Sequence, residues 1–178
     1  MFLVLIKEGG CFLELDMQLN SMNFKKMKVG IILILLMTAL PSFSQLITYD
    51  FEKLDSLQKV EKRNVMVFIH ADWCKYCKAM KQTTFKNKTI QQTLNNQFYF
   101  IQLDAEERKT IHFNDTAFTY LPNGNKTGSN TLALELANIN GEVNYPTITF
   151  LNPDNEIIFQ YSGFMTSEEL GKILKKLY

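Results

Sequence analysis

A short apolar run that leads directly into two closely spaced cysteines sets the narrowest limit on how this chain can fold. Residues 65–69 read Val-Met-Val-Phe-Ile, and an unbroken run of this kind is typical of a strand that is buried on both faces. Cys74 and Cys77 follow after a turn, and from Lys75 the sequence can continue as a helix to about Thr83. The region therefore predicts a strand, a tight turn and a helix whose start carries two thiols.

The chain from residue 50 onward alternates between helical and extended patterns. Apolar spacing and turn residues predict helices over 50–61, 75–83, 89–94 and 167–177, and strands over 65–69, 98–103, 147–151 and 157–161. Asp50 and Ser167 stand where they can cap the first and the last of these helices. A strand–helix–strand half followed by a strand–strand–helix half predicts the α/β class, with a mixed central sheet and helices on both of its faces.

Residues 108–144 separate the two halves and follow a different pattern. Short apolar segments on either side of Asn114-Asp115 favour a small hairpin. Residues 122–130 hold two Gly and three Asn and predict a loop, whereas residues 131–137 predict one or two helical turns. We interpret the whole of 108–144 as an insertion between the two halves of the fold.

Composition excludes several classes of protein without naming a function. The chain has 178 residues, of which 46% are hydrophobic, and its net charge is +1. This balance provides no strong field to attract nucleic acid or an anionic membrane surface, so we expect no nucleic-acid partner. Three cysteines are too few for a disulfide scaffold, so the function has to be sought in local motifs.

The N-terminal part of the sequence predicts export. The run from Val29 to Leu40 contains no charged residue, but it is shorter than the roughly 20 residues that a membrane-spanning helix needs. Lysines precede this run, and Pro41-Ser42-Phe43-Ser44 follows it with the small residues that a signal peptidase requires. We predict a start-site artefact over 1–21, a signal peptide over 22–44 cleaved near Ser44, and a domain over 45–178 in the periplasm or cell envelope. A cytoplasmic tail on a membrane-anchored protein is the alternative.

The two cysteines that remain after cleavage predict redox chemistry. In an oxidising compartment, Cys74 and Cys77 have no cysteine partner but each other. At a helix N-terminus, unpaired backbone N–H groups and the helix dipole favour the thiolate form of Cys74, and Lys75 and Lys78 add positive charge. The thiolate is the nucleophile in disulfide exchange, and Cys77 can then resolve a mixed disulfide formed at Cys74.

Three other interpretations of the cysteine pair compete with this one. A zinc site commonly uses Cys-x-x-Cys but needs four ligands, and only His70 and His112 are available besides the two thiols. A purely structural disulfide across three residues closes almost no loop and stabilises little. An inert reduced pair conflicts with export to an oxidising compartment. We therefore favour the redox interpretation and expect no metal.

The residues around the cysteines resemble the active site of the thioredoxin-like superfamily. Residues 71–78 read Ala-Asp-Trp-Cys-Lys-Tyr-Cys-Lys and are similar to its Trp-Cys-x-x-Cys-Lys motif. Tyr145-Pro146-Thr147 is similar to its cis-proline loop, and Gly163 to the glycine before its last helix. The chain also resembles exported thioredoxin-related proteins of Bacteroidetes and the C-terminal domain of thiol:disulfide interchange proteins. The resemblance implies a thioredoxin-like three-layer sandwich, with 108–144 inserted before the cis-proline loop and beside the substrate groove.

The resemblance also implies roles for individual residues. Cys74 would be the attacking thiolate and Cys77 the resolving thiol. Trp73 would shield the pair, Pro146 would face the disulfide in its cis form, and the backbone of Tyr145 would pair with a bound substrate strand. The residues expected to bind substrate are Trp73, Lys75, Tyr76, Tyr145 and Pro146. No cofactor is expected besides the redox-active Cys74–Cys77 disulfide.

The dipeptide between the cysteines is Lys75-Tyr76 and not the Gly-Pro of thioredoxin, and such residues tune the reduction potential. Two buried positions also depart from the pattern of thioredoxin. That protein has a buried acid six residues before its first active-site cysteine and a lysine partner on the next strand, and here these positions are Phe68 and Phe100. Proton transfer to and from the resolving thiol must therefore use His70, Asp72 or water. The alternative for His70 is a histidine at the end of a strand that hydrogen-bonds to the backbone.

The sequence thus predicts an exported thiol–disulfide oxidoreductase that reduces protein disulfides. An upstream thiol–disulfide electron donor must recharge the dithiol, and a membrane-bound donor is the natural candidate. Two alternatives stay open: a thioredoxin-fold binding or chaperone-like module in which the cysteines are incidental, and a disulfide-forming oxidase.

Overall fold

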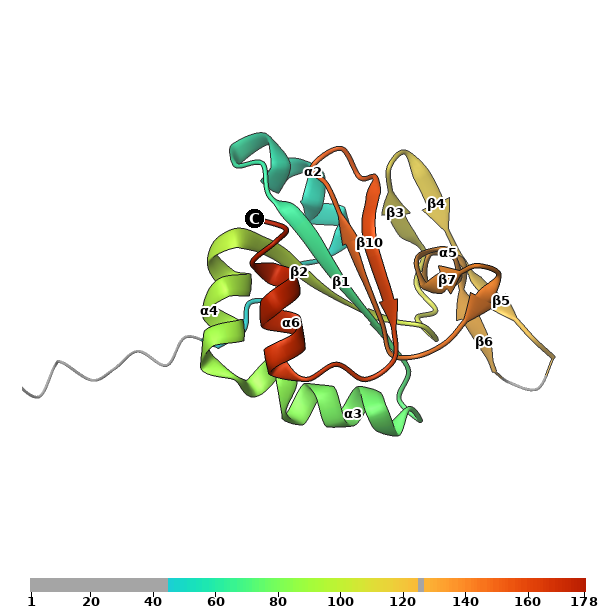
Figure 1. Cartoon of the computed structure of the whole chain (residues 1–178). Coiled ribbons are helices and arrows are strands. Elements are labelled where there is room, and N and C mark those ends of the chain that lie inside the picture. The colour runs from blue at the N-terminus through green and yellow to red at the C-terminus, as the bar shows by residue number, and fades with distance from the viewer. Residues whose placement is uncertain (1–44, 125–126) are drawn as a thin grey trace, which may run out of the picture. The chain divides into compact units, whose positions relative to one another are not determined.

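The computed structural model describes residues 45–124 and 127–178, and a four-stranded sheet forms its centre (Figure 1). The strand order is β10 (Ile157–Ser162), β9 (Thr147–Leu151), β1 (Asn64–His70) and β2 (Phe98–Asp104). Strand β1 runs parallel to β2 and antiparallel to β9, and β9 is antiparallel to β10. The mixed central sheet predicted from the sequence is therefore confirmed.

Strand β1 lies in the middle of the sheet because both of its faces carry apolar side chains. Every residue from Val65 to His70 is buried. Side chains alternate between the faces of a strand, so Phe68 and His70 point to one face and the odd-numbered residues to the other. The register with β2 pairs His70 with Asp104, so the ends of these two strands lie together.

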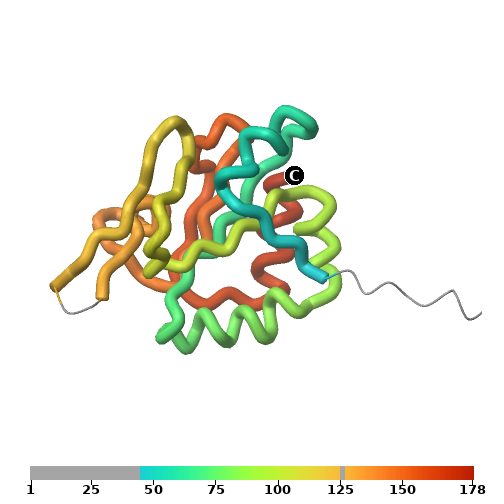
Figure 2. The backbone as a smooth tube through the Cα atoms, turned by 180° about the vertical axis from the view of Figure 1, so that it is seen from behind, coloured from blue at the N-terminus to red at the C-terminus, as the bar shows by residue number. Residues whose placement is uncertain are grey.

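Helices cover both faces of the sheet, which gives the three layers predicted (Figures 1 and 2). The helices on the face of Phe68 are α3 (Lys75–Gln82), α4 (Lys88–Gln97) and α6 (Ser167–Leu174), with the short 3-10 turn η1 (Thr84–Lys86) between α3 and α4. The helices on the other face are α2 (Phe51–Val60) and α5 (Thr131–Ala137). Ring contacts and hydrogen bonds bear out this division. Phe85 of η1 packs on Phe68 with centroids 4.7 Å apart, whereas the hydroxyl of Thr149 donates to the carbonyl of Leu136 in α5 at 2.6 Å.

Three small hairpins lie beside the main sheet in the region 108–144 (Figure 1). They pair β3 (Ile111–Phe113) with β4 (Thr116–Phe118), β5 (Tyr120–Pro122) with β6 (Gly128–Asn130), and β7 (Asn138–Ile139) with β8 (Glu142–Val143). The hairpin predicted around Asn114 and Asp115 is confirmed, with positive φ angles of 51° and 58° at its turn. The interpretation of 108–144 as an insertion stays a prediction.

The loop predicted over 122–130 is wrong at its end, where β6 forms. Gly128 in β6 is buried against the ring of Tyr120, and a Cβ atom there would lie 2.6 Å from Cζ of that ring. The absence of a side chain at Gly128 therefore lets the two strands approach closely. Propensity alone did not reveal this, because glycine is a turn residue in most contexts.

Two predicted helix ends also differ. Helix α6 is capped by Thr166 and not by Ser167, since the Thr166 hydroxyl accepts from the Glu169 backbone while the Glu169 carboxylate accepts from the Thr166 backbone. Asp50 occupies the N-cap position of α2, but its side chain makes no capping hydrogen bond. The predicted segments 1–21 and 22–44 lie outside the described residues. Within the described part of the chain, no helix is long and apolar enough to cross a bilayer.

Candidate active site

Cys74 and Cys77 form a disulfide at the N-terminus of α3. Their Cα atoms are 5.3 Å apart, and 5% of Cys74 and 1% of Cys77 is exposed. Cys74 is the N-cap residue of the helix, and its Sγ accepts a hydrogen bond of 3.0 Å from the backbone N–H of Cys77. A sulfur that replaces the usual capping oxygen lies where helix N–H groups favour negative charge. The helix therefore supports the thiolate of Cys74 when the disulfide opens.

The cis-proline loop lies at the same end of the sheet as the disulfide. The Tyr145–Pro146 peptide bond is cis, and the next residue, Thr147, pairs with Ile69 near the end of β1. The carbonyl of Pro146 accepts a hydrogen bond of 2.8 Å from the backbone of Gly163. Gly163 has a φ of +121°, which residues with a side chain rarely adopt. This link joins the loop before β9 to the loop after β10.

Aromatic side chains line the surface beside the disulfide. The rings of Trp73 and Tyr145 meet edge to face with centroids 6.1 Å apart. Trp73 is 65% exposed and Tyr76 is 66% exposed, whereas Pro146 is buried. Exposed aromatic rings of this size are a common feature of surfaces that bind other proteins. The predicted substrate-binding residues Trp73 and Tyr145 are thus in contact, and Lys75 lies exposed next to Tyr76.

Tyr145 also links the site to the hairpin region. Burial raises the pKa of Tyr145, and a hydrogen bond with the side chain of Ser129 in β6 acts in the opposite direction. The charges of Glu106 and Asp104 raise the pKa further. The hairpin β5–β6 therefore reaches the residue that precedes the cis-proline.

Residues 51–178 match the sequence model of the thioredoxin-like domain family. The chain belongs to this family. A thioredoxin from Thermus thermophilus is 21% identical, has a TM-score of 0.53, and is aligned over 74% of this chain and 86% of its own. A protein described as DsbH oxidoreductase is 13% identical, has a TM-score of 0.54, and is aligned over 78% of this chain and 90% of its own. No curated protein sequence matches the chain.

Membership of the thioredoxin-like family and a Cys-x-x-Cys disulfide together fit a thiol–disulfide oxidoreductase. At the identities found, the two solved structures support the fold and nothing beyond it. The predicted family and fold class are confirmed, and the roles of individual residues stay predictions.

This thioredoxin-like domain has an apolar interior where thioredoxin has a buried acid and a lysine. Phe68 and Phe100 are buried, and both pack against Phe85 with centroids 4.7 and 5.2 Å away. Three aromatic rings fill the space between β1, β2 and η1. Neither Phe68 nor Phe100 can exchange a proton with the cysteines, as the sequence indicated.

His70 contacts a residue that sequence reasoning missed. Its Nε2 lies 3.0 Å from Nζ of Lys81 and its Nδ1 has no hydrogen-bond partner among the residues that the structure describes, so the interpretation of a ring bonded to the backbone is wrong. Burial lowers the pKa of His70, the charge of Lys81 lowers it further, and Asp104 and Asp72 raise it. Asp72 itself is exposed, so it acts on His70 as a nearby charge. Helical spacing could have identified Lys81, because it lies four residues after Cys77 and hence on the same helix face.

The zinc alternative finds no assembled site among the described residues. No group of three or more His, Cys, Asp or Glu side chains is arranged to hold a metal ion in residues 45–124 and 127–178. His112 lies exposed on β3, in a sheet separate from that of His70. The two histidines that this interpretation required therefore do not lie together.

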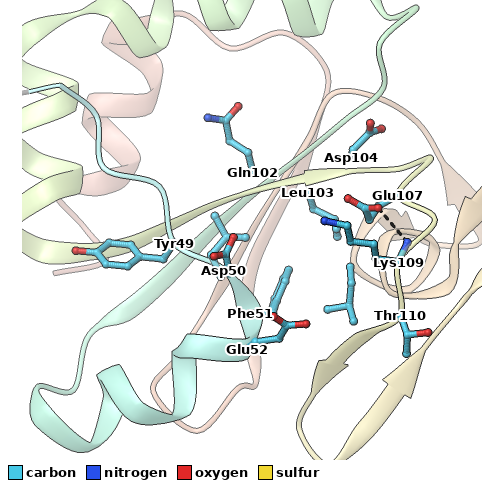
Figure 3. A pocket seen from close by; sticks show the side chains of 12 residues that line it. Tyr49, Asp50, Phe51, Glu52, Gln102, Leu103, Asp104, Glu107, Lys109 and Thr110 are labelled. Atoms are coloured by element: carbon cyan, nitrogen blue, oxygen red, sulfur yellow. Dashed lines mark hydrogen bonds between the residues drawn. The ribbon is translucent and has the colours of Figure 1, made fainter.

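A cavity of about 260 Å³ lies where the start of α2, the end of β2 and residues 107–111 meet (Figure 3). Carboxylates dominate its polar lining, and the backbone N–H of Lys109 donates to Glu107 at 3.0 Å. The acidic lining residues are Asp50, Glu52, Asp104 and Glu107. Asp104 also pairs with His70 across the strands, so the cavity adjoins the end of the sheet that carries His70.

Proposed function

We propose that this protein is an exported thiol–disulfide oxidoreductase that reduces disulfide bonds in protein substrates. The observation that carries the proposal is the disulfide at the start of α3, with Cys74 as the helix cap and its Sγ in contact with the backbone N–H of Cys77. This arrangement favours the thiolate of the residue closer to the surface and keeps the second thiol buried. Nucleophile and resolving thiol therefore have distinct environments.

The reaction proceeds through two exchanges that conserve electrons and atoms. In the reduced protein, the thiolate of Cys74 attacks one sulfur of a substrate disulfide, and the other substrate sulfur leaves as a thiolate. Cys77 then loses its proton and attacks Sγ of Cys74, which breaks the mixed disulfide and releases the second substrate sulfur. The substrate gains two electrons, and the protein ends with the Cys74–Cys77 disulfide.

The rim of the site supports binding of an extended substrate segment. Trp73 and Tyr76 offer exposed aromatic surface beside the disulfide, and Tyr145, in contact with Trp73, and Pro146 complete the rim in this proposal. Lys75 adds a positive charge next to Tyr76 that favours acidic side chains on the substrate. Backbone groups of Tyr145 are the expected partners of the substrate chain.

The predicted signal peptide supports a location for this reaction in the periplasm or cell envelope. A signal peptide over 22–44 would deliver the domain to the periplasm or cell envelope, where substrate disulfides persist. The oxidised pair must then be reduced again by a thiol–disulfide donor that carries electrons to that compartment. A membrane-bound protein with its own dithiol is the donor class that we propose.

The reduction potential of the Cys74–Cys77 pair tests this proposal. The full chain with Cys11→Ser is equilibrated with dithiothreitol or glutathione buffers, so that only the pair responds. We expect a potential near that of thioredoxin, about −270 mV, which suits a reductant. A potential near −120 mV would instead indicate a disulfide-forming oxidase. If the pair forms no disulfide in any buffer, the redox proposal is rejected and a docking module takes its place.

A further inference from the structure

Two ionisable side chains connect the end of β1 to α3, the helix that begins at the active-site disulfide. Nζ of Lys81 in α3 lies 3.0 Å from Nε2 of His70 at the end of β1. His70 is only 7% exposed, and Lys81 is partly buried. Among the described residues, His70 is the only histidine, lysine, arginine or carboxylic acid that is buried. Its position therefore requires a reason beyond packing.

Lys81 lies on the same face of α3 as Cys77, the proposed resolving cysteine. Residues four apart lie on the same face of a helix, with Cβ atoms about 5–6 Å apart. Lys81 follows Cys77 by one turn, and Cys77 is 1% exposed because its helix face packs on the sheet. His70 points to that same face of the sheet. Lys81 thus lies one helical turn after Cys77 on the same face of α3, and its partner His70 lies on the sheet face that α3 covers.

The ring of His70 carries an unused hydrogen-bonding group. A lysine ammonium can only donate, so Nε2 of His70 accepts from it, and the neutral ring then carries its proton on Nδ1. Nδ1 is buried and has no hydrogen-bond partner among the described residues. A buried donor without a partner costs about 1–3 kcal/mol. An acceptor that appears only in the reduced protein would satisfy this group.

The other charges that face the pair are both negative. Asp72 in the turn before Cys74 and Asp104 at the end of β2 act on His70 and on Lys81. Burial lowers the pKa of Lys81, and the two carboxylates oppose this effect. Burial and Lys81 keep His70 in its neutral form, as the directions of its pKa shift indicate. The pair as a whole therefore carries the single positive charge of Lys81.

We propose that His70 and Lys81 are positioning residues that stabilise the thiolate of Cys77 and so speed the resolving step. The inference rests on the proposed function for the role of Cys77. The thiol proton of Cys77 passes to water, the positive pair stabilises the anion, and the anion then attacks Sγ of Cys74 in the mixed disulfide. The Cys74–Cys77 bond forms as the bond from Cys74 to the substrate breaks, and the substrate sulfur leaves with the electron pair. Phe68 and Phe100 carry no ionisable group. In this proposal, the His70–Lys81 pair therefore stabilises the Cys77 thiolate, which those two positions cannot do.

The test measures the midpoint pH of thiolate formation at Cys77 alone. The full chain carries Cys11→Ser and Cys74→Ser, and the ultraviolet absorbance of the thiolate is followed against pH. Removing the charge with Lys81→Met is expected to raise the midpoint by about one pH unit, the size typical of losing one close opposite charge. Lys81→Arg should restore most of the shift because it keeps the charge.

The control is Lys86→Met, which removes an equal charge from an exposed site on η1. It should leave the midpoint where it was. A shift with Lys86→Met as large as that with Lys81→Met, or no shift with Lys81→Met, overturns the inference. His70→Phe keeps an aromatic ring beside Phe68 and should also raise the midpoint; if that variant does not fold, the partly exposed Lys81 still decides the question.

These outcomes are separate from those of the proposed function. The midpoint is measured without substrate, so it reports on the pair even if the chain reduces no disulfide. If the protein exchanges no disulfides, the proposed function is rejected. If the midpoint pH is unchanged in Lys81→Met, only the proposed role of the His70–Lys81 pair is rejected. In the chain with both cysteines, single-turnover resolution of a mixed disulfide should shift its pH profile upward in Lys81→Met.

Discussion

The strand–turn–helix unit around the disulfide and the hairpin region 108–144 are built on different physical principles. In the first, β1 is buried along almost its whole length, and Cys77 and Met80 bury the inner face of α3. In the second, strands of two or three residues pair in small hairpins, and side chains such as Thr131 and Asn130 bond to the backbone of neighbouring segments. Hydrophobic burial dominates the first region, whereas in the second it is concentrated in α5 and Phe113, and side-chain hydrogen bonds connect the short strands to their neighbours.

Asn130 illustrates the second principle. Its side chain is fully buried, its amide nitrogen donates to the carbonyls of Glu107 and Lys109 at 3.2 Å, and its oxygen accepts from Leu132 at 3.0 Å. One side chain thus joins the segment after β2 to the start of α5. We therefore expect substitutions in the disulfide region to change mainly the activity, and substitutions in the hairpin region to change mainly the free energy of unfolding.

The largest expected effect is the loss of activity in Cys74→Ser. Reduction of a protein disulfide such as insulin should fall to the background rate, because the hydroxyl is not a nucleophile in disulfide exchange. Cys11→Ser is the matched control and should keep full activity. Activity that persists in Cys74→Ser would contradict the role of this residue, and the enzyme proposal with it.

Asn130→Ala should have the largest effect on stability. It removes the three hydrogen bonds of a buried side chain, one of which caps α5, so we expect the free energy of unfolding to fall by about 2–3 kcal/mol. Chemical denaturation of the oxidised protein measures this change. Asn96→Ala, at an exposed site on α4, should change it by no more than about 0.5 kcal/mol. If Asn130→Ala and Asn96→Ala lower the free energy of unfolding equally, the proposed importance of the Asn130 hydrogen bonds for the hairpin region is contradicted.

A smaller effect is expected where the two regions meet. Ser129 of β6 bonds the side chain of Tyr145, whose ring packs on Trp73. Ser129→Ala and Tyr145→Phe should each raise KM for a protein substrate several-fold while the reduction potential stays the same. Because they break one interaction, the double substitution should be little worse than either single one. Fully additive effects would show that the hairpin does not act through Tyr145.

The smallest expected effect is on the pH dependence of stability. His70 has a lowered pKa in the folded protein, so the unfolded chain binds this proton more tightly. The stability that comes from neutral His70 is complete above its ordinary pKa of about 6.5 and is lost as pH falls through the lowered value in the folded protein. His70→Phe should flatten the decrease in Tm of the oxidised protein below pH 6.5, and His112→Phe should not. Parallel curves for the parent chain and His70→Phe would contradict this.

Much of the fold could be predicted because burial leaves a clear trace in the sequence. The apolar run of β1 and the spacing in α2 and α6 identified these elements to within a few residues. The predicted loop over 122–130 failed at β6, since its pairing depends on the close approach of Gly128 to Tyr120. Caps were also misjudged, because Thr166 and Ser167 are equally suitable by type and only geometry selects one.

The amino-acid sequence alone identifies the reactive groups of this protein: two thiols three residues apart, at the end of a buried strand and the start of a helix. Local backbone geometry suffices for that, because strand, turn and helix follow one another along the chain. The neighbours of this unit depend on the packing of the whole domain. Lys81 meets His70, and Ser129 meets Tyr145, through contacts between segments that packing brings together. Long-range contacts of this kind depend on how helices and hairpins pack on the sheet: helical spacing places Lys81 on the face of Cys77 but does not identify His70 as its partner.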